Sequence, residues 1–418
     1  PRVGMLETIR EYAGERLDEG GEVEAVRARH AAHYLALAER AEPHLWGGAD
    51  QRAWVARLDT ERDNLRAALG WAEERGEAEL GLGLVAALGR FWFIDGRTSE
   101  GRDRLERALA AAPLGSAALR ARALFYMGLL ATQQSDRDGA MASAEASLAL
   151  FRALGDARWT AMVLGNLAHA ALNTGDRERA AALFEESLAL SRGRGEAWGF
   201  VRGLPLALFG WLLLGRGERT AVRRAATLLE EALALGRTAR NAETVALAQI
   251  GLGWAAHYAG DAARGTALLE EAVAQFGAIG TYLGGLDARL SLGWVSLRAG
   301  ESARAAGLFG AGLVLAAERG SQARVVDALR GLGALAARRG EPGCTARLFA
   351  AADRLCETVG PPPYPSGPAY EHALAAARAE CDGAAWAAAW AAGRVLPLEE
   401  AIAEALAAGA AATAARPA

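Results

Sequence analysis

A short motif recurs along the chain at nearly constant spacing, and this repetition constrains the fold more than any other feature of the sequence. Each copy places a small residue in an apolar stretch, and a turn follows seven or eight residues later. Successive small residues lie 40, 42, 43, 40 and 40 positions apart. The six small residues are Gly128, Ala168, Gly210, Gly253, Gly293 and Gly333. Self-similarity at this period is typical of a solenoid, in which each helix pair buries its apolar face on its neighbours.

A solenoid presents an extended surface to its surroundings, which favours a binding or sensing module over a deep catalytic pocket. Ahead of these six copies lies another, with Gly89, Gly96, Gly101, Leu105, Ala108 and Pro113 at offsets of 0, 7, 12, 16, 19 and 24 residues. This spacing resembles the tetratricopeptide helix-turn-helix pattern, including its closing proline. We therefore predict an all-α solenoid of about seven tetratricopeptide-like repeats of ~40 residues, with helical caps at both ends.

Changes in periodicity and composition predict six segments along the chain. An amphipathic pattern ends at Gly20 and Gly21, and a proline-rich stretch that no helix can cross follows the last repeat. The expected segments are a helix over 1–20, an N-terminal helical cap over 21–78, the repeats over 79–360, a proline-rich linker over 361–368, a C-terminal helical cap over 369–408 and a disordered tail over 409–418.

All 46 cationic residues are arginine, and the absence of lysine excludes several kinds of chemistry. A phosphate-binding P-loop requires a lysine, as do a Schiff base and a lysine general base. The formal net charge of −4 gives no indication of a nucleic-acid surface over the whole chain. These observations favour a module that carries no ATPase site of its own and does not bind nucleic acid directly.

The three cysteines are far apart and odd in number, so they predict neither a disulfide framework nor a zinc site. We expect them to be reduced in a cytoplasmic protein. No signal peptide is visible, and the longest apolar stretch, around residues 206–214, is too short to span a membrane. The chain starts at Pro1 in what reads as the middle of a helix, and we expect it to be part of a longer protein.

Three segments together resemble the C-terminal region of large bacterial transcriptional regulators. They are residues 5–13 (MLETIREYA), 57–69 (RLDTERDNLRAAL) and 387–401 (AAAWAAGRVLPLEEA). The family is that of the STAND-type predicted ATPases, many of which also carry a LuxR-type DNA-binding domain. Two positions depart from the family pattern: Gly14 stands where a helix former is expected, and Pro397 stands where the family often has serine.

In that family a P-loop ATPase and a winged-helix segment precede a long tetratricopeptide array. The resemblance therefore implies that residues 1–20 follow a winged-helix segment that is missing here. It also implies that the ATPase and winged-helix domains of a parent chain are partners of this region. By this resemblance the chain is a sensor and oligomerisation arm and not a motor.

Several patterns imitate functional motifs but have a simpler structural explanation. Residues 251–256 and 331–336 look like a dinucleotide-binding fingerprint, yet both fall mid-helix at one phase of the repeat, where small residues let helices approach closely. His30 and His33 lie three residues apart without a third metal ligand nearby. Pairs of glutamates recur at one phase of the second helix of each repeat, which indicates a solvated face. We expect no catalytic residue, metal or cofactor.

The best candidate for a binding surface is the concave face, which the first helix of each repeat lines in tetratricopeptide stacks. Positions one, four and five after each small residue are expected there, and aromatic rings with a few polar groups suit a peptide or a small effector. The candidates are Trp211, Trp254, Trp294, His257, Tyr258, Arg298, His169, Asn173, Gln133 and Arg338. Arg298 and Arg338 could hold a carboxylate through two hydrogen bonds. In repeats this long, however, the tryptophans could equally fill the core between helices, and the sequence leaves both placements open.

The leading hypothesis is a non-catalytic repeat domain that senses a ligand or a protein partner within an ATPase-type regulator. An effector on the concave face would favour one curvature of the solenoid and so release or recruit the ATPase portion. The alternative is a free-standing scaffold that binds a peptide or helix of a partner. An enzyme is a third hypothesis, which no cluster of residues supports. An oligomer is compatible with each of them.

Overall fold

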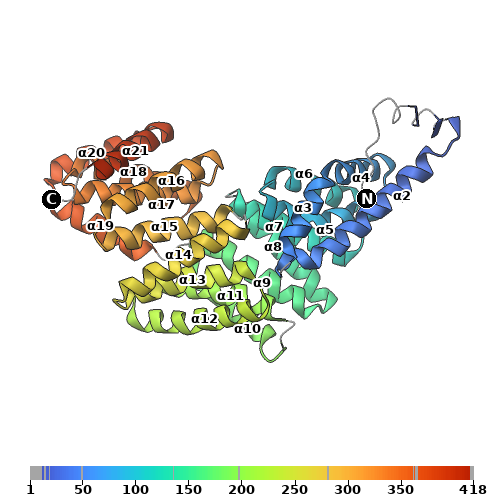
Figure 1. Ribbon diagram of the computed structural model, residues 1–418, viewed down its shortest axis with the longest axis horizontal. Helices are drawn as coiled ribbons and strands as arrows, with labels where there is room; N and C mark the ends of the chain where they lie inside the picture. The colour runs from blue at the N-terminus through green and yellow to red at the C-terminus, as the bar shows by residue number, and fades with distance from the viewer. Residues whose placement is uncertain are drawn as a thin grey trace. The chain divides into compact units, whose positions relative to one another are not determined.

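The computed structural model describes residues 12–13, 16–17, 19–48, 50–134, 136–195, 198–279, 282–360, 362 and 366–414. Over these residues it contains twenty α-helices, one 3-10 helix and no strand, which confirms the all-α solenoid (Figure 1). The chain forms two compact units, Pro1–Met127 and Gly128–Ala418. Most of the helix expected over residues 1–20 lies outside the described residues, and the expected segment limits stay predictions.

The first unit contains a helical N-terminal region and the start of the repeats. Its elements are α2 (Val23–Ala41), η1 (Glu42–Trp46), α3 (Gln51–Thr60), α4 (Arg62–Arg75), α5 (Ala78–Asp95), α6 (Thr98–Ala111) and most of α7 (Ala117–Gln133). Helix α5 is the centre of this unit, because nearly all of its residues from Gly81 to Trp92 are buried. It packs against α2, η1, α4 and α6.

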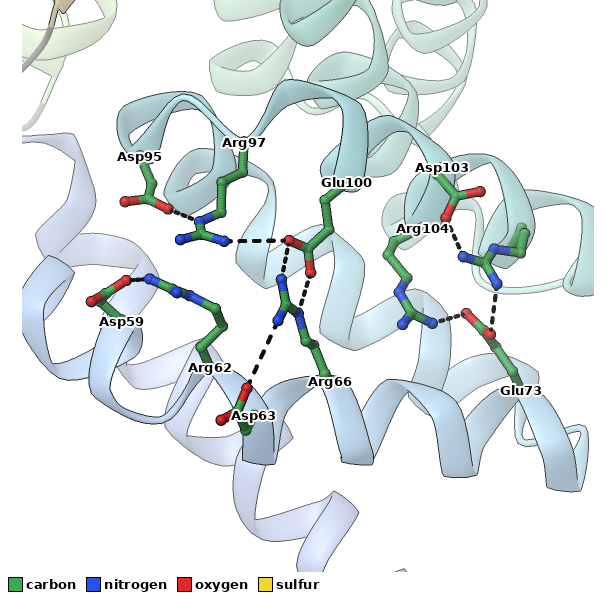
Figure 2. Close-up of polar contacts among 11 residues, drawn as sticks. Asp59, Arg62, Asp63, Arg66, Glu73, Asp95, Arg97, Glu100, Asp103 and Arg104 are labelled. Atoms are coloured by element: carbon green, nitrogen blue, oxygen red, sulfur yellow. Dashed lines mark hydrogen bonds and ion pairs between the residues drawn. The ribbon is translucent and has the colours of Figure 1, made fainter.

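Ion pairs tie the outer helices of the first unit together, as Figure 2 shows. The Arg66 guanidinium of α4 meets the Glu100 carboxylate of α6 through two hydrogen bonds of 2.7 Å each. These bonds hold the pKa of Glu100 below its usual range. One turn further along, Glu73 of α4 accepts hydrogen bonds from Arg104 and Arg107 of α6. Because these groups are partly exposed, the network positions α6 on α4 more than it stabilises the fold.

The second unit continues the repeats and ends in three further helices. Its elements are α8 (Arg137–Leu154), α9 (Ala157–Asn173), α10 (Arg177–Ser191), α11 (Gly199–Leu214), α12 (Arg219–Thr238), α13 (Ala242–Tyr258), α14 (Ala262–Ile279), α15 (Tyr282–Arg298), α16 (Ser302–Glu318), α17 (Gln322–Arg338), α18 (Pro342–Val359), α19 (Gly367–Ala379), α20 (Gly383–Val395) and α21 (Leu398–Ala414). The first helices of successive repeats, α9, α11, α13, α15 and α17, each pack against the next.

The small residue of each repeat lets the two helices of that repeat approach closely. A methyl group added at Gly253 of α13 would lie 2.7 Å from Leu269 and 3.1 Å from the carbonyl oxygen of Gly265, both on α14. One added at Gly333 of α17 would lie 2.7 Å from the ring of Phe349 on α18. The first helix therefore needs glycine at these two positions, where a large residue of the second helix inserts.

A second glycine, two positions before the small residue, lets the first helix approach the second helix of the preceding repeat. The Phe309 ring of α16 lies between Gly293 of α15 and Gly331 of α17, where added methyl groups would come within 2.8 and 2.4 Å of it. In the same way, Leu229 of α12 lies between Gly210 and Gly251. The Gly-x-Gly pattern at 251–253 and 331–333 is thus explained by packing on both sides of one helix.

The end of the repeat array is covered by α20 and α21. Helix α20 packs along α18, and α21 packs on α16, α17 and α18. The Arg347 guanidinium of α18 pairs with the Glu404 carboxylate of α21 at 2.6 Å. A methyl group at Gly393 of α20 would lie 2.3 Å from the backbone carbonyl oxygen of Arg347, so this glycine allows the closest approach between α18 and α20.

We predict that Gly331→Ala destabilises the second unit by about 1–3 kcal/mol, because the new methyl group overpacks a fully buried ring. Gly307→Ala is the matched control, since Gly307 is an exposed mid-helix glycine of α16 with no atom within 4 Å of an added methyl group. The control should be neutral or stabilise by up to about 1 kcal/mol through helix propensity. Urea unfolding followed by circular dichroism measures both. Equal effects of the two substitutions would contradict the packing explanation.

Candidate binding surface at the ends of the first helices

The expected binding residues of the second unit cluster at the last turns of the first helices. We call the surface around these turns the inner face, and it comprises residues 169–177, 211–217, 254–260, 294–300 and 334–340. Each turn exposes the carbonyl ends of a helix, which carry partial negative charge and favour arginine nearby. Accordingly, Arg338 donates to the carbonyl oxygen of Leu297 at 2.5 Å, and Arg177 donates to that of Leu212 at 2.5 Å.

The three tryptophans are buried in the core between helices, which is the second of the two placements that the sequence left open. Trp211, Trp254 and Trp294 expose 4%, 0% and 1% of their surface. Trp211 Nε1 donates to the carbonyl oxygen of Leu247 at 3.1 Å, and Trp294 Nε1 donates to Asp327 Oδ1 at 3.1 Å. Their rings lie beneath the surface of the inner face. Direct contact between a ligand and these rings stays a prediction.

His257, Tyr258 and Arg298 come together at the ends of α13 and α15. The His257 ring lies edge-on to the Trp254 ring at 6.0 Å between centroids, and Tyr258 lies 5.5 Å from Trp254. Burial and the positive charge of Arg298 lower the pKa of His257 to about 4, so this imidazole is neutral at neutral pH. Burial likewise raises the pKa of Tyr258.

The neutral imidazole of His257 offers one hydrogen-bond donor and one acceptor. Both of its ring nitrogens are buried, and neither has a hydrogen-bond partner among the described residues. A buried polar group without a partner costs about 1–3 kcal/mol, and such groups are uncommon in native proteins. The exposed Arg298 side chain makes no hydrogen bond or ion pair with any of the described residues. Arg298 is therefore accessible to a bound molecule, and the two His257 nitrogens have unused hydrogen-bonding capacity beneath the same surface.

The remaining expected residues have structural surroundings of different kinds. Arg338 is engaged with the end of α15, as described above. His169 of α9 is partly buried, and burial followed by the charge of Arg324 lowers its pKa to about 4. Asn173 ends α9, where its backbone carbonyl oxygen lies against Gly360. Gln133 ends α7 and is partly buried.

Sequence reasoning missed three charged residues at this surface. Burial lowers the pKa of Arg177, and the neighbouring charge of Arg216 adds to the effect. Glu371 of α19 acts in the opposite direction on Arg177, and its charge also reaches Tyr258. Arg177 and Arg216 could have been found from their position beside each turn. Glu371 could not, because its place depends on how α19 returns to the repeats.

A buried carboxylate lies where α19 meets the last repeat. Asp327 of α17 accepts hydrogen bonds from Trp294 Nε1 at 3.1 Å and from Ser366 Oγ at 2.8 Å. Burial raises the pKa of Asp327 to about 6, although both hydrogen bonds oppose the shift. At the equivalent position of the preceding repeat, Asp287 pairs instead with both ends of the Arg324 guanidinium, at 2.7 and 2.9 Å.

The described residues contain neither a metal-binding cluster nor a membrane-spanning helix. His, Cys, Asp and Glu side chains do not gather there into a group of three that could hold a metal ion. No helix in that part of the chain combines the length and the apolar character needed to cross a membrane. The three cysteines, Cys344, Cys356 and Cys381, carry free thiols and are partly buried.

The buried Asp327 should make the unfolding free energy depend on pH. Its pKa is higher in the folded protein than in the unfolded chain, so the fold favours the protonated form. This contribution to stability is complete below about pH 4 and is lost as pH rises through about 6. The unfolding free energy of the wild type minus that of Asp327→Asn should therefore fall by roughly 2 kcal/mol between pH 4 and pH 7. Urea unfolding at several pH values measures this difference, and a constant value would contradict the assignment.

Comparisons with known proteins support a regulator-like repeat region. Proteins from Mycobacterium bovis and Mycobacterium tuberculosis, whose names assign them to the HTH-type transcriptional regulators, are 37% identical over 167 residues. That stretch covers 37% of this chain and 18% of the length of each relative. A Rap protein crystallised with competence and sporulation factor has a TM-score of 0.59 at 14% identity, covering 91% of this chain and 99% of the Rap chain. No protein-family model matches the chain. The chain is thus similar in fold to a helical repeat protein, and in part of its sequence to transcriptional regulators.

Proposed function

We propose that this chain is a non-catalytic repeat module that binds a protein or peptide segment on the inner face of its second unit. The observation that carries the proposal is the pair of nitrogens on the partly buried His257 ring that have no hydrogen-bond partner among the described residues, together with the exposed Arg298 guanidinium, whose charge acts on this ring. A neutral imidazole and an arginine together suit a partner that offers amide groups and a carboxylate.

Charge at the inner face favours an acidic partner. The charge of Arg216 acts on Arg177 and that of Arg298 acts on His257, whereas the Glu371 carboxylate acts on Arg177 and Tyr258. An excess of arginine over carboxylate attracts an acidic segment and accelerates its association. The Rap protein of similar fold was crystallised with competence and sporulation factor, and the likeness supports the fold of the proposed module.

The setting that we propose is an ATPase-type bacterial transcriptional regulator, of which this chain would be the sensing arm. The relatives named as HTH-type regulators and the three family-like segments of the sequence support this setting. In it, the ATPase and winged-helix domains of the parent chain would respond to a partner bound at the inner face. A cytoplasmic location follows from the same proposal.

The binding surface can be tested with peptides selected from a random dodecapeptide display library. We expect the selected peptides to be acidic, and we expect Arg298→Glu to weaken their binding at least tenfold, because it removes a charge-assisted hydrogen bond and adds a repulsion. The matched control is Arg224→Glu on α12, where the exposed Arg224 pairs with Glu185 on another second helix. Fluorescence anisotropy measures both affinities. Equal loss in the two variants would contradict binding at the inner face.

The regulator setting has a separate test in the gene. We expect the reading frame upstream of the codon for Pro1 to encode a P-loop, a glycine-rich loop that ends in lysine followed by serine or threonine. Sequencing the locus measures this directly. A start codon within a few residues, with no such loop, would contradict the regulator setting and favour a free-standing scaffold.

A further inference from the structure

The start and the end of the repeats in the second unit are in direct contact. Arg137 Nε, in the first turn of α8, donates to the carbonyl oxygen of Val359 at 2.8 Å, across 222 residues of sequence. The next residue, Gly360, has a φ of +81°, and a methyl group added there would lie 2.3 Å from the carbonyl oxygen of Asn173. The last turn of α18 thus lies against the beginning of α8 and the end of α9.

Helix α19 continues from this contact and stacks on the last repeat as the first helix of a further repeat would. Its N-cap residue, Ser366, donates to Asp327 of α17. The Tyr370 hydroxyl donates to Asp353 Oδ1 at 2.9 Å, and the Arg330 guanidinium lies 4.0 Å above the Tyr370 ring. Ala369, Tyr370 and Ala377 form the buried side of α19.

The N-terminal end of α19 lies against the inner face. An added methyl group at Gly217, in the turn between α11 and α12, would lie 3.4 Å from Pro368 Cγ. Glu371 follows Pro368 by one turn, and its charge acts on Arg177 and Tyr258. Glu371 therefore places a negative charge near Arg177 and Tyr258.

We propose that α19 and the end of α18 form a clasp that closes over the inner face and competes with the partner for it. The clasp consists of the contacts Arg137–Val359, Gly360–Asn173 and Pro368–Gly217, with Glu371 as an internal substitute for the partner's carboxylate. This inference rests on the proposed function for the identity of the competitor, and on the contacts alone for the clasp itself.

In this proposal the clasp opens before the repeats separate, while α19 stays on α17. Its single described hydrogen bond joins a guanidinium to a backbone carbonyl, and Nη2 of the same arginine is buried without a partner. The stack of α19 on α17, by contrast, buries Tyr370 and the carboxylate of Asp327.

A disulfide between positions 217 and 368 can lock the clasp. The Cβ position built on Gly217 lies 3.5 Å from Pro368 Cβ, which is at the short end of the range that disulfides span. The variant is Gly217→Cys with Pro368→Cys in the full chain, with the three natural cysteines replaced by alanine. Gly217 has a φ of +69°, so cysteine there is strained, and the oxidised form is compared only with the reduced form of the same variant.

Hydrogen exchange tests the clasp without any partner. We expect the disulfide to form readily and to slow exchange at least fivefold in residues 169–175 and 254–260, with recovery on reduction. Failure of the disulfide to form would overturn the closed arrangement. Equal exchange rates in the oxidised and reduced forms would contradict the proposal that the clasp opens. Arg137→Ala should speed exchange in the same residues, whereas Arg152→Ala, an exposed arginine of α8 paired with Glu186, should leave it unchanged.

An acidic peptide from the display selection tests the competition. Oxidation should weaken its binding at least tenfold, and Arg137→Ala should strengthen it about threefold to tenfold. If oxidation leaves the affinity for the peptide unchanged, the clasp does not compete with the partner for the inner face. A third outcome is that hydrogen exchange responds to oxidation but neither the oxidised nor the reduced form binds a selected peptide. That result would contradict the proposed function and support the clasp.

Discussion

The close approach of helices at glycine is the constraint on which the rest of this structure depends. Phe309 lies between Gly293 and Gly331, and Leu229 lies between Gly210 and Gly251, so one large side chain joins two successive first helices through a single second helix. Because each contact involves only neighbouring repeats, the stability of the array is close to a sum of local terms. The spacing of about 40 residues follows from the same contacts, since a shift by one position would bring a side chain into the space that glycine leaves.

This packing also explains why the candidate binding groups lie at the helix ends. The first helices are buried along most of their length, and the tryptophans that follow the small residues fill the space between them. Side chains become accessible only in the last turn, where the helix stops and its carbonyl groups need partners. Arginine satisfies some of these carbonyls, and an arginine that is not needed for this purpose, such as Arg298, remains for other contacts.

The sequence predicts the repeats well because their signal is local. A small residue, a turn and a large residue at fixed offsets are all that one repeat requires, and these offsets can be counted. It predicts His257, Tyr258 and Arg298 as neighbours for the same reason, since they occupy equivalent positions in successive repeats. It could not place the tryptophans, because helix length decides whether a ring reaches the surface. Nor could it find the contact of Arg137 with Val359, which depends on the accumulated rotation of all the repeats between them.

The way in which the repeat array ends has a consequence of a different kind. In a repeat array the last repeat leaves an apolar face on which a further repeat could pack, as on a template. Here α19 occupies the template on α17, while α20 and α21 cover α16–α18. At the junction, the hydroxyl of Ser366 replaces the arginine that pairs with the equivalent carboxylate one repeat earlier. The array therefore carries its own terminator, and its length is encoded in the sequence that follows it.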